Sequence, residues 1–177
     1  KSKLSPTTSY GKSKTLAEKN LFKLSNKKFK VLLIRMVTLF GNSKRMRFDL
    51  LVNNLIGSYI KNKKIILKSD GKKIRPQIHI KDASKVYEYF IFNDILNNHL
   101  VINVGRADYN LTVGQIARKI SKTLKCKILY GKKDKDKRSY RVSFKKFQKM
   151  KILNNSSNTI ERSTIVIKKY FKYKENI

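Results

Sequence analysis

Cysteine and long apolar runs are scarce in this chain of 177 residues. The single cysteine, Cys126, excludes an intramolecular disulfide and any zinc site built from several cysteines, and it favours a reducing compartment. The longest aliphatic runs, such as Val31 to Ile34, fall far short of the ~20 apolar residues that cross a bilayer. We therefore expect a cytoplasmic protein without a membrane span.

Acidic residues are also few. The sequence has 11 Asp and Glu against 43 Lys and Arg, a formal net charge of +32. Such a charge makes a basic nucleic-acid-binding module one alternative for the function. The positive charge is mostly lysine scattered along the whole chain, whereas a dedicated nucleic-acid binder concentrates Arg and Lys on one helix or stripe. The distribution disfavours nucleic acid as a partner without excluding it.

Glycine-rich loops and metal-ligand clusters are missing as well. None of the seven glycines forms G-x-G-x-x-G or a near relative, so these residues lack the turn that cradles a dinucleotide pyrophosphate. His79 and His99 are the only histidines, and a zinc site needs three or four ligands. We predict no metal and expect His79 and Asp82 to organise the junction between a strand and a helix.

Apolar residues recur with the periods of helices and of buried strands, and the two patterns alternate. Helical spacing predicts helices over Thr8–Leu24, Phe48–Ile60, Asp82–Phe90, Thr112–Leu124 and Ile160–Phe171. Short apolar runs predict strands over Phe29–Met36, Ile65–Leu67, Gln77–Ile80, Leu100–Val104 and Cys126–Leu129, with loops over Thr38–Lys44 and Lys132–Lys137. The pattern indicates an α/β fold, and the length fits a single domain over residues 1–177.

Tyr10 and Lys14 lie four residues apart at the start of the first predicted helix, so their side chains share one face. An ammonium near a phenol stabilises the phenolate, which suits a tyrosine to acid and base catalysis near neutral pH. Tyr59 with Lys63 and Tyr170 with Lys174 have the same spacing, so spacing alone does not single out one pair.

Three stretches in the right order and spacing give the chain a family resemblance. They are Ser9–Lys14 (SYGKSK), Ser69–Asp82 (SDGKKIRPQIHIKD) and Asp136–Ser143 (DKRSYRVS). Together they resemble the second half of an extended short-chain dehydrogenase/reductase, the NAD-dependent epimerase/dehydratase family that modifies nucleotide sugars. The resemblance implies the later strands of a Rossmann-like parallel sheet plus a small substrate-binding lobe, without the N-terminal dinucleotide-binding half.

The resemblance assigns Tyr10 and Lys14 as the catalytic pair. The tyrosine would exchange a proton with a sugar hydroxyl, and the lysine would also hold the nicotinamide ribose of NAD or NADP. Met36 and Val37 would lie beside the cofactor, and Thr38 beside the sugar. Two positions depart from the family pattern, because Met36 replaces a frequent proline and Thr38 replaces a frequent asparagine.

The resemblance also implies a site for the nucleotide. Arg75 and Arg138 would grip the diphosphate of the nucleotide sugar, and the planar guanidinium suits that task because it makes bidentate contacts to phosphate oxygens. Phe48 and Asn53 would cradle the nucleotide, although core packing explains Phe48 equally well.

The sequence thus predicts part of an NAD-dependent enzyme that transfers hydride and a proton at a sugar hydroxyl of a nucleotide sugar. The complete protein is expected to be a homodimer, and the isolated chain to be inactive. Two alternatives stay open, namely the basic nucleic-acid-binding module and a non-catalytic partner that dimerises through the Tyr10 helix.

Overall fold

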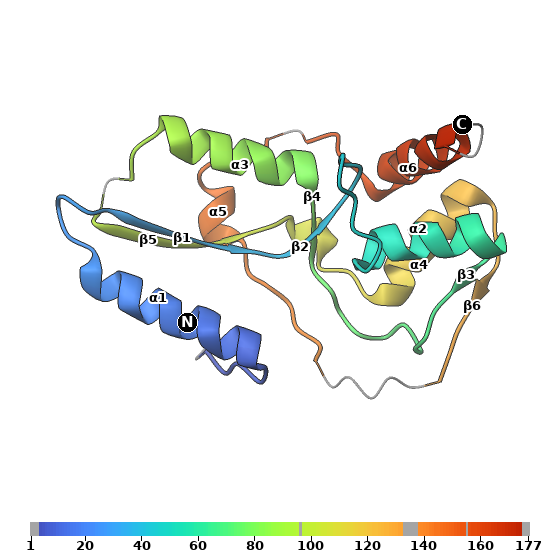
Figure 1. Cartoon of the computed structure of the whole chain (residues 1–177), viewed down its shortest axis with the longest axis horizontal. Coiled ribbons are helices and arrows are strands. Elements are labelled where there is room, and N and C mark those ends of the chain that lie inside the picture. Colours follow the sequence, from blue (N-terminus) through green and yellow to red (C-terminus); the bar gives the residue numbers. More distant parts are fainter. Residues whose placement is uncertain (1–3, 96, 133–137, 155, 175–177) are drawn as a thin grey trace.

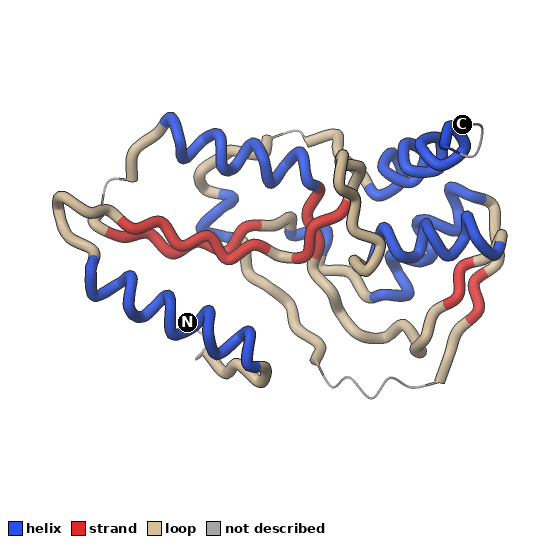
Figure 2. Tube along the Cα trace, viewed as in Figure 1, coloured by secondary structure: helices blue, strands red, loops and turns tan. Residues whose placement is uncertain are grey.

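The computed structural model describes residues 4–95, 97–132, 138–154 and 156–174. Helices and strands alternate along most of the chain (Figures 1 and 2). In chain order the elements are α1 (Ser9–Leu24), β1 (Val31–Met36), β2 (Thr38–Phe40), α2 (Leu51–Asn62), β3 (Ile65–Ile66), β4 (Gln77–His79), α3 (Ile80–Phe92), β5 (His99–Val104), the 3₁₀ turn η1 (Ala107–Tyr109), α4 (Val113–Leu124), β6 (Ile128–Leu129), α5 (Lys145–Gln148) and α6 (Ile160–Lys174). The predicted α/β class is confirmed.

Every pair of named strands is parallel. Strand β1 pairs with β5 in a register that runs from Val31 opposite His99 to Met36 opposite Val104. Strand β2 pairs with β4, and β3 pairs with β6. Parallel neighbours require a long connection, and helices supply it in each case.

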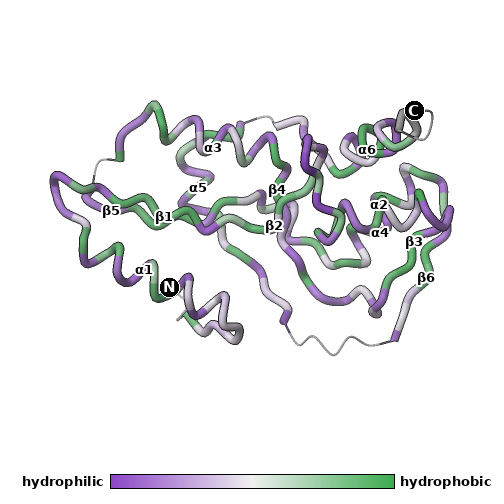
Figure 3. The backbone as a smooth tube through the Cα atoms, viewed as in Figure 1, coloured by the Kyte–Doolittle hydropathy of each residue, from purple (hydrophilic) through white to green (hydrophobic). Residues whose placement is uncertain are grey.

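Helices cover both faces of the β1–β5 pair. Figure 1 shows α1 on one side and α3 with α5 on the other. The side chains of β1 alternate accordingly: Leu32 and Ile34 pack towards α3 and α5, whereas Arg35 bonds to Glu18 of α1. Figure 3 shows hydrophobic residues prominent along the paired strands. This alternation gives the strand one apolar face and one face that carries a charge.

Buried side chains form two clusters. One joins the β1–β5 pair to α3 and α5 and contains Ile78, Val86, Ile102, Val104, Phe144 and Phe147. The other joins α2, α4 and α6 to β3 and contains, among others, Val52, Ile56, Ile65, Ile116, Ile120, Ile160 and Ile167. Strand β2 extends from the first cluster to the second, where its Phe40 is buried. The single domain over 1–177 stays a prediction.

Two predicted boundaries on the N-terminal side are wrong. Thr38 to Phe40 form β2 rather than the start of a loop, because Gln77 to His79 offer a parallel partner. The first strand begins at Val31 rather than Phe29, because the Asn26 side chain accepts hydrogen bonds from the amides of Lys28 and Phe29 in a turn.

The later elements also differ in their limits. Helix α3 begins at Ile80, which shortens the preceding strand to Gln77–His79. Strands β3 and β6 contain two residues each, fewer than predicted, and the short helix α5 has no counterpart in the prediction. Most of the predicted loop Lys132–Lys137 lies outside the described residues. No helix in the described ranges combines the length and apolarity that a membrane span requires.

Candidate functional site

Helix α1 presents Tyr10 and Lys14 together, as the spacing predicts. Thr8 caps the helix, with its hydroxyl oxygen accepting a hydrogen bond of 3.1 Å from the amide of Gly11. Lys14 Nζ lies 5.5 Å from the centre of the Tyr10 ring. Tyr10 is 72% exposed, so a molecule outside this chain can reach its side chain. The phenol and the ammonium therefore lie together at the exposed start of α1.

An ion pair joins α1 to β1. Arg35 donates from Nε to Glu18 Oε1 at 2.9 Å and from Nη2 to Glu18 Oε2 at 2.5 Å. The hydrogen bond to Glu18 raises the pKa of the Arg35 guanidinium. Further along the helix the Phe22 ring packs on the His99 ring of β5, with centroids 4.3 Å apart. These contacts place the Tyr10 helix on one face of the strand pair.

Met36, Val37 and Thr38 lie where β1 ends and β2 begins. Met36 packs against the buried cluster beneath α3, and the Val37 amide donates to the Val104 carbonyl at 3.2 Å. Gly105 follows Val104, and a Cβ at Gly105 would come within 2.9 Å of the Val37 side chain and 2.6 Å of the Phe144 ring. All three predicted residues are half-buried at the carboxyl end of the strand, where open α/β sheets bind ligands.

Gly41 and His79 are in close contact behind this strand end. Gly41 has φ +114°, and a Cβ there would lie 2.5 Å from His79 Nε2. The His79 Nδ1 accepts a hydrogen bond from the Lys81 amide at 3.1 Å and thereby caps α3. Burial lowers the pKa of His79. The histidine thus organises the junction between β4 and α3, as predicted.

Asn53 is buried on α2 and bonds to the main chain. Its Oδ1 accepts from the Gly41 amide at 3.1 Å, and its Nδ2 donates to the Arg47 carbonyl at 3.1 Å. The amide group therefore fixes the segment between β2 and α2. Phe48 is half-buried in the same segment, and its ring packs edge-on against Phe171 of α6. The structure gives both residues a packing or bracing role, and their nucleotide contacts stay a prediction.

Arg75 and Arg138 come together although they are far apart in sequence. The Arg75 guanidinium donates through Nη1 to the Arg138 carbonyl and to the Ile74 carbonyl, the latter at 3.0 Å. The Ile74 amide in turn donates to Ser139 Oγ at 3.1 Å. Arg75 is half-buried and Arg138 is exposed. The two segments that the sequence assigns to a diphosphate therefore lie against one another.

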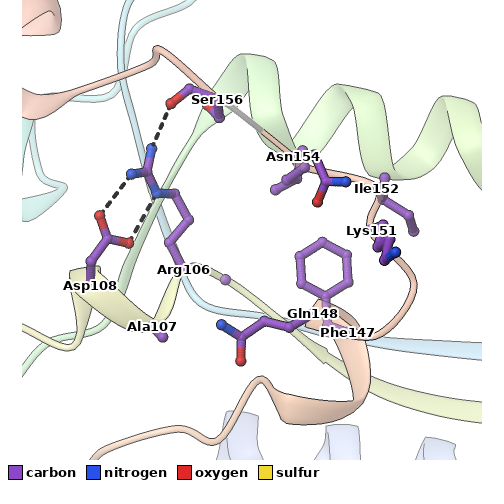
Figure 4. Close-up of a pocket in the computed structure, with 11 residues that line it drawn as sticks. Arg106, Ala107, Asp108, Phe147, Gln148, Lys151, Ile152, Asn154 and Ser156 are labelled. Atoms are coloured by element: carbon purple, nitrogen blue, oxygen red, sulfur yellow. Dashed lines mark hydrogen bonds and ion pairs between the residues drawn. The ribbon is translucent and has the colours of Figure 1, made fainter.

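A separate hollow of about 560 Å³ lies beyond the carboxyl end of β5 (Figure 4). Arg106, paired with Asp108, forms one wall, and Phe147 of α5 forms another. Phe147 belongs to the buried cluster on the face of β1 opposite α1. None of the predicted site residues lines this hollow, so it is distinct from the Tyr10 helix and from the arginine pair.

Sequence reasoning missed several residues that hold these groups in place. Glu18, eight residues after Tyr10 on α1, is one of them, because it pairs with Arg35 of β1. The contact of Ser139 with Ile74 joins segments more than sixty residues apart, and no local pattern signals it. The stretch around Arg138 assigns that arginine to the diphosphate by resemblance, but it does not signal the contact with Ile74.

Comparisons with known proteins identify the family and the fold of the chain. The model of the NAD-dependent epimerase/dehydratase family matches residues 1–105. The NAD-dependent NDP-hexosamine 5,6-dehydratase of tunicamycin biosynthesis, TunA, is 19% identical with a TM-score of 0.77, over 96% of this chain and 55% of that one. The UDP-glucuronic acid 4-epimerase from Bacillus cereus, solved with UDP-glucuronic acid and NAD, is 17% identical with a TM-score of 0.76, over 96% and 54%.

A third structure belongs to the dTDP-glucose 4,6-dehydratase from Bacillus anthracis strain Ames, solved with NAD. It is 20% identical with a TM-score of 0.74, over 98% of this chain and 55% of that one. The chain spans about half the length of the solved structures that it matches. At these identities the likeness establishes the fold, and the predicted partial Rossmann-like architecture is confirmed.

Proposed function

The chain belongs to the NAD-dependent epimerase/dehydratase family, and from this premise we propose that the complete protein is an NAD-dependent enzyme that acts on a nucleotide sugar. The contact between Arg75 and Arg138 carries the proposal. It holds the Arg75 and Arg138 segments side by side, and a guanidinium, which can make bidentate contacts, suits a diphosphate better than a lysine does. The described residues then form the substrate-binding part.

Tyr10 and Lys14 are the proposed acid–base pair. The phenol hydroxyl exchanges a proton with a sugar hydroxyl, and the Lys14 ammonium, 5.5 Å from the ring centre, stabilises the phenolate that results. Both side chains are exposed, so a substrate that lies over this end of α1 can reach them. Thr38 at the strand end is the proposed contact to the sugar.

The described residues fit only one end of the cofactor. Tyr10 and Lys14 offer donors for the nicotinamide ribose, and Met36 and Val37 offer half-buried apolar surface beside it. No glycine-rich phosphate cradle occurs among the seven glycines of the sequence. NAD bound there would supply the hydride acceptor for the sugar carbon, in a form that can also return the hydride. NAD is the cofactor named for the solved relatives, and we adopt it over NADP.

Activity is proposed to need the other half of the fold, joined covalently or supplied as a second chain. Within the described ranges, β5 is the only strand that pairs with β1, so the second edge of β1 is available for the missing strands. The complete protein is proposed to be a cytoplasmic homodimer. Helix α1 suits a subunit contact, because Leu16 and Leu24 are each 59% exposed.

A binding experiment on this chain tests the nucleotide part of the proposal. Isothermal titration with UDP-glucuronic acid and dTDP-glucose is compared with UMP, which lacks the second phosphate. We expect Arg75→Lys to weaken binding of both diphosphates at least about tenfold, because lysine cannot make the bidentate contact. The matched control is Arg162→Lys on α6, an exposed arginine whose guanidinium bonds to the Ser157 carbonyl.

Three outcomes would contradict the proposal. Equal affinity of Arg75→Lys and the unaltered chain for the diphosphates removes the proposed role of the arginine pair. Binding of a short DNA duplex that falls steeply with salt, without any binding of nucleotide sugars, favours the nucleic-acid module instead. Turnover by the purified chain with NAD and a panel of nucleotide sugars would show that the other half is not needed.

A further inference from the structure

Helix α1 lies on the strand pair with little packing to hold it. None of its 16 residues, all of which the structure describes, is buried. By contrast, α2 and α4 contain four and five buried residues in 12 positions each. Apolar burial is what normally fixes an amphipathic helix on a sheet. Within the described residues, the position of α1 therefore depends on a few specific side-chain contacts.

The Glu18–Arg35 ion pair is the strongest of these contacts. It is bidentate, and the Glu18 side chain is only 20% exposed while that of Arg35 is 36% exposed. A second bidentate pair, Arg47–Asp49, is exposed on both sides, at 66% and 63%, and links residues only two apart. Partial burial and fork geometry make the first pair stronger and more directional than the second.

The place of this pair along α1 relates it to Tyr10 and Lys14. Figure 1 shows α1 running antiparallel to β1. Arg35 is the penultimate residue of β1, and Tyr10 precedes Glu18 by eight residues, which is ~12 Å along the helix axis. Moving from Glu18 towards Tyr10 therefore follows the strand past its carboxyl end, towards Thr38.

We propose that Glu18 and Arg35 are positioning residues that set the register of α1 on β1 and so hold Tyr10 and Lys14 at the carboxyl end of the strand. The position of α1 on β1 can be tested in this chain alone. The catalytic consequence rests on the proposed function, because it matters only if Tyr10 and Lys14 meet the substrate. Rotation or sliding of α1 by one residue would change where both side chains lie relative to the end of β1.

Hydrogen exchange tests the register directly. Glu18→Gln keeps the shape of the side chain but removes its charge, and the double variant Glu18→Arg with Arg35→Glu restores a reversed pair. We expect Glu18→Gln to raise backbone amide exchange across residues 9–24 by about tenfold while α4 is unchanged, and the double variant to restore most of the protection. Asp49→Asn, which removes the exposed pair, is the matched control and should leave α1 unaffected.

Two results would contradict the proposal that Glu18 and Arg35 set the register of α1. One is exchange of α1 in Glu18→Gln within about twofold of the unaltered chain. The other is an equal loss of protection in α1 and α4, which would make the pair a general support of the fold rather than of one helix.

Kinetics of the complete protein separate a positioning role from a merely structural one. We expect Glu18→Gln to lower kcat about tenfold or more with KM for the nucleotide sugar within about twofold, since the arginine pair is untouched, and the double variant to recover kcat. Unchanged kcat despite a loosened α1 would overturn the positioning role. Absence of turnover in the unaltered complete protein would instead contradict the proposed function, and the exchange result would still decide the register.

Discussion

The Ser156 hydroxyl donates to both carboxylate oxygens of Asp82, at 2.7 and 2.8 Å, across 74 residues of sequence. Asp82 lies in the first turn of α3 and is fully buried. Asn158 adds a hydrogen bond to the same carboxylate. Arg106 holds the segment from the other side through the Ser156 and Asn158 carbonyls. This network fastens the segment before α6 to the first turn of α3 and to Arg106, which follows β5.

Removal of the Ser156 hydroxyl should destabilise the fold. Ser156→Ala leaves a buried carboxylate short of one donor, and we expect a loss of about 1–3 kcal/mol in the free energy of unfolding. Urea denaturation measures it. Ser157→Ala, at the exposed neighbouring position, is the control and should cost under about 0.5 kcal/mol. Equal effects of the two variants would contradict the role given to this hydrogen bond.

The free energy of unfolding should decrease as the pH is lowered, because His79 takes up a proton. Burial lowers its pKa in the folded state, so the unfolded chain binds the proton more readily. Stability is therefore complete above the ordinary histidine pKa of about 6.5 and declines as pH falls below it, at no more than about 1.4 kcal/mol per pH unit. Unfolding measured at pH 7.5 and 5.5 should show a smaller difference in His79→Gln. The exposed His99→Gln serves as the control.

A methyl group at Gly41 should not be tolerated. Gly41→Ala combines a positive φ with a contact of 2.5 Å to the His79 ring, and we expect a loss of about 1–3 kcal/mol or more. Gly57→Ala is the opposite case, because its Cβ would meet Phe48 at an ordinary 3.4 Å within α2. That variant should gain about 0.5–1 kcal/mol from helix propensity. Thermal denaturation of both variants checks the contrast.

Tyr10→Phe should separate activity from stability in the complete protein. In this chain the Tyr10 side chain is 72% exposed, so loss of its hydroxyl should leave the melting temperature of this chain unchanged. Turnover of the nucleotide sugar should fall by about 10²–10⁴, the usual contribution of an acid–base group. The control is Tyr87→Phe, which removes a hydroxyl from the exposed face of α3. An active Tyr10→Phe enzyme would assign the proton transfer to another residue.

Local features of the fold could be predicted from the sequence because their signals are local. The predicted helix over Thr112–Leu124 is α4, and Thr112 caps it: the Gln115 amide donates to the Thr112 hydroxyl oxygen, and the Thr112 amide donates to the Gln115 side-chain oxygen. The helix over Thr8–Leu24 was predicted within a residue at its start. Both depend on a cap and an apolar period that lie within one stretch of chain.

Features made by distant partners could not be predicted in the same way. Strand β2 exists because β4 lies beside it, and three residues carry no detectable period. The partners of Asp82 and Ile74 follow them by more than sixty residues. The arginine pair was anticipated through family resemblance, whereas the direct contact of Arg75 with the Arg138 carbonyl is new information from the fold.

The parallel pairing of every named strand also bears on how the chain folds. Val31 meets His99, Thr38 meets Gln77, and Ile65 meets Ile128. No strand can gain its partner until a long loop has closed, and loop closure costs entropy before any contact rewards it. Helices such as α4, with its complete capping box, can form first. Refolding should therefore be slower than that of helical bundles of similar size. Until the strands pair, their free edges can also bind other chains, which promotes aggregation.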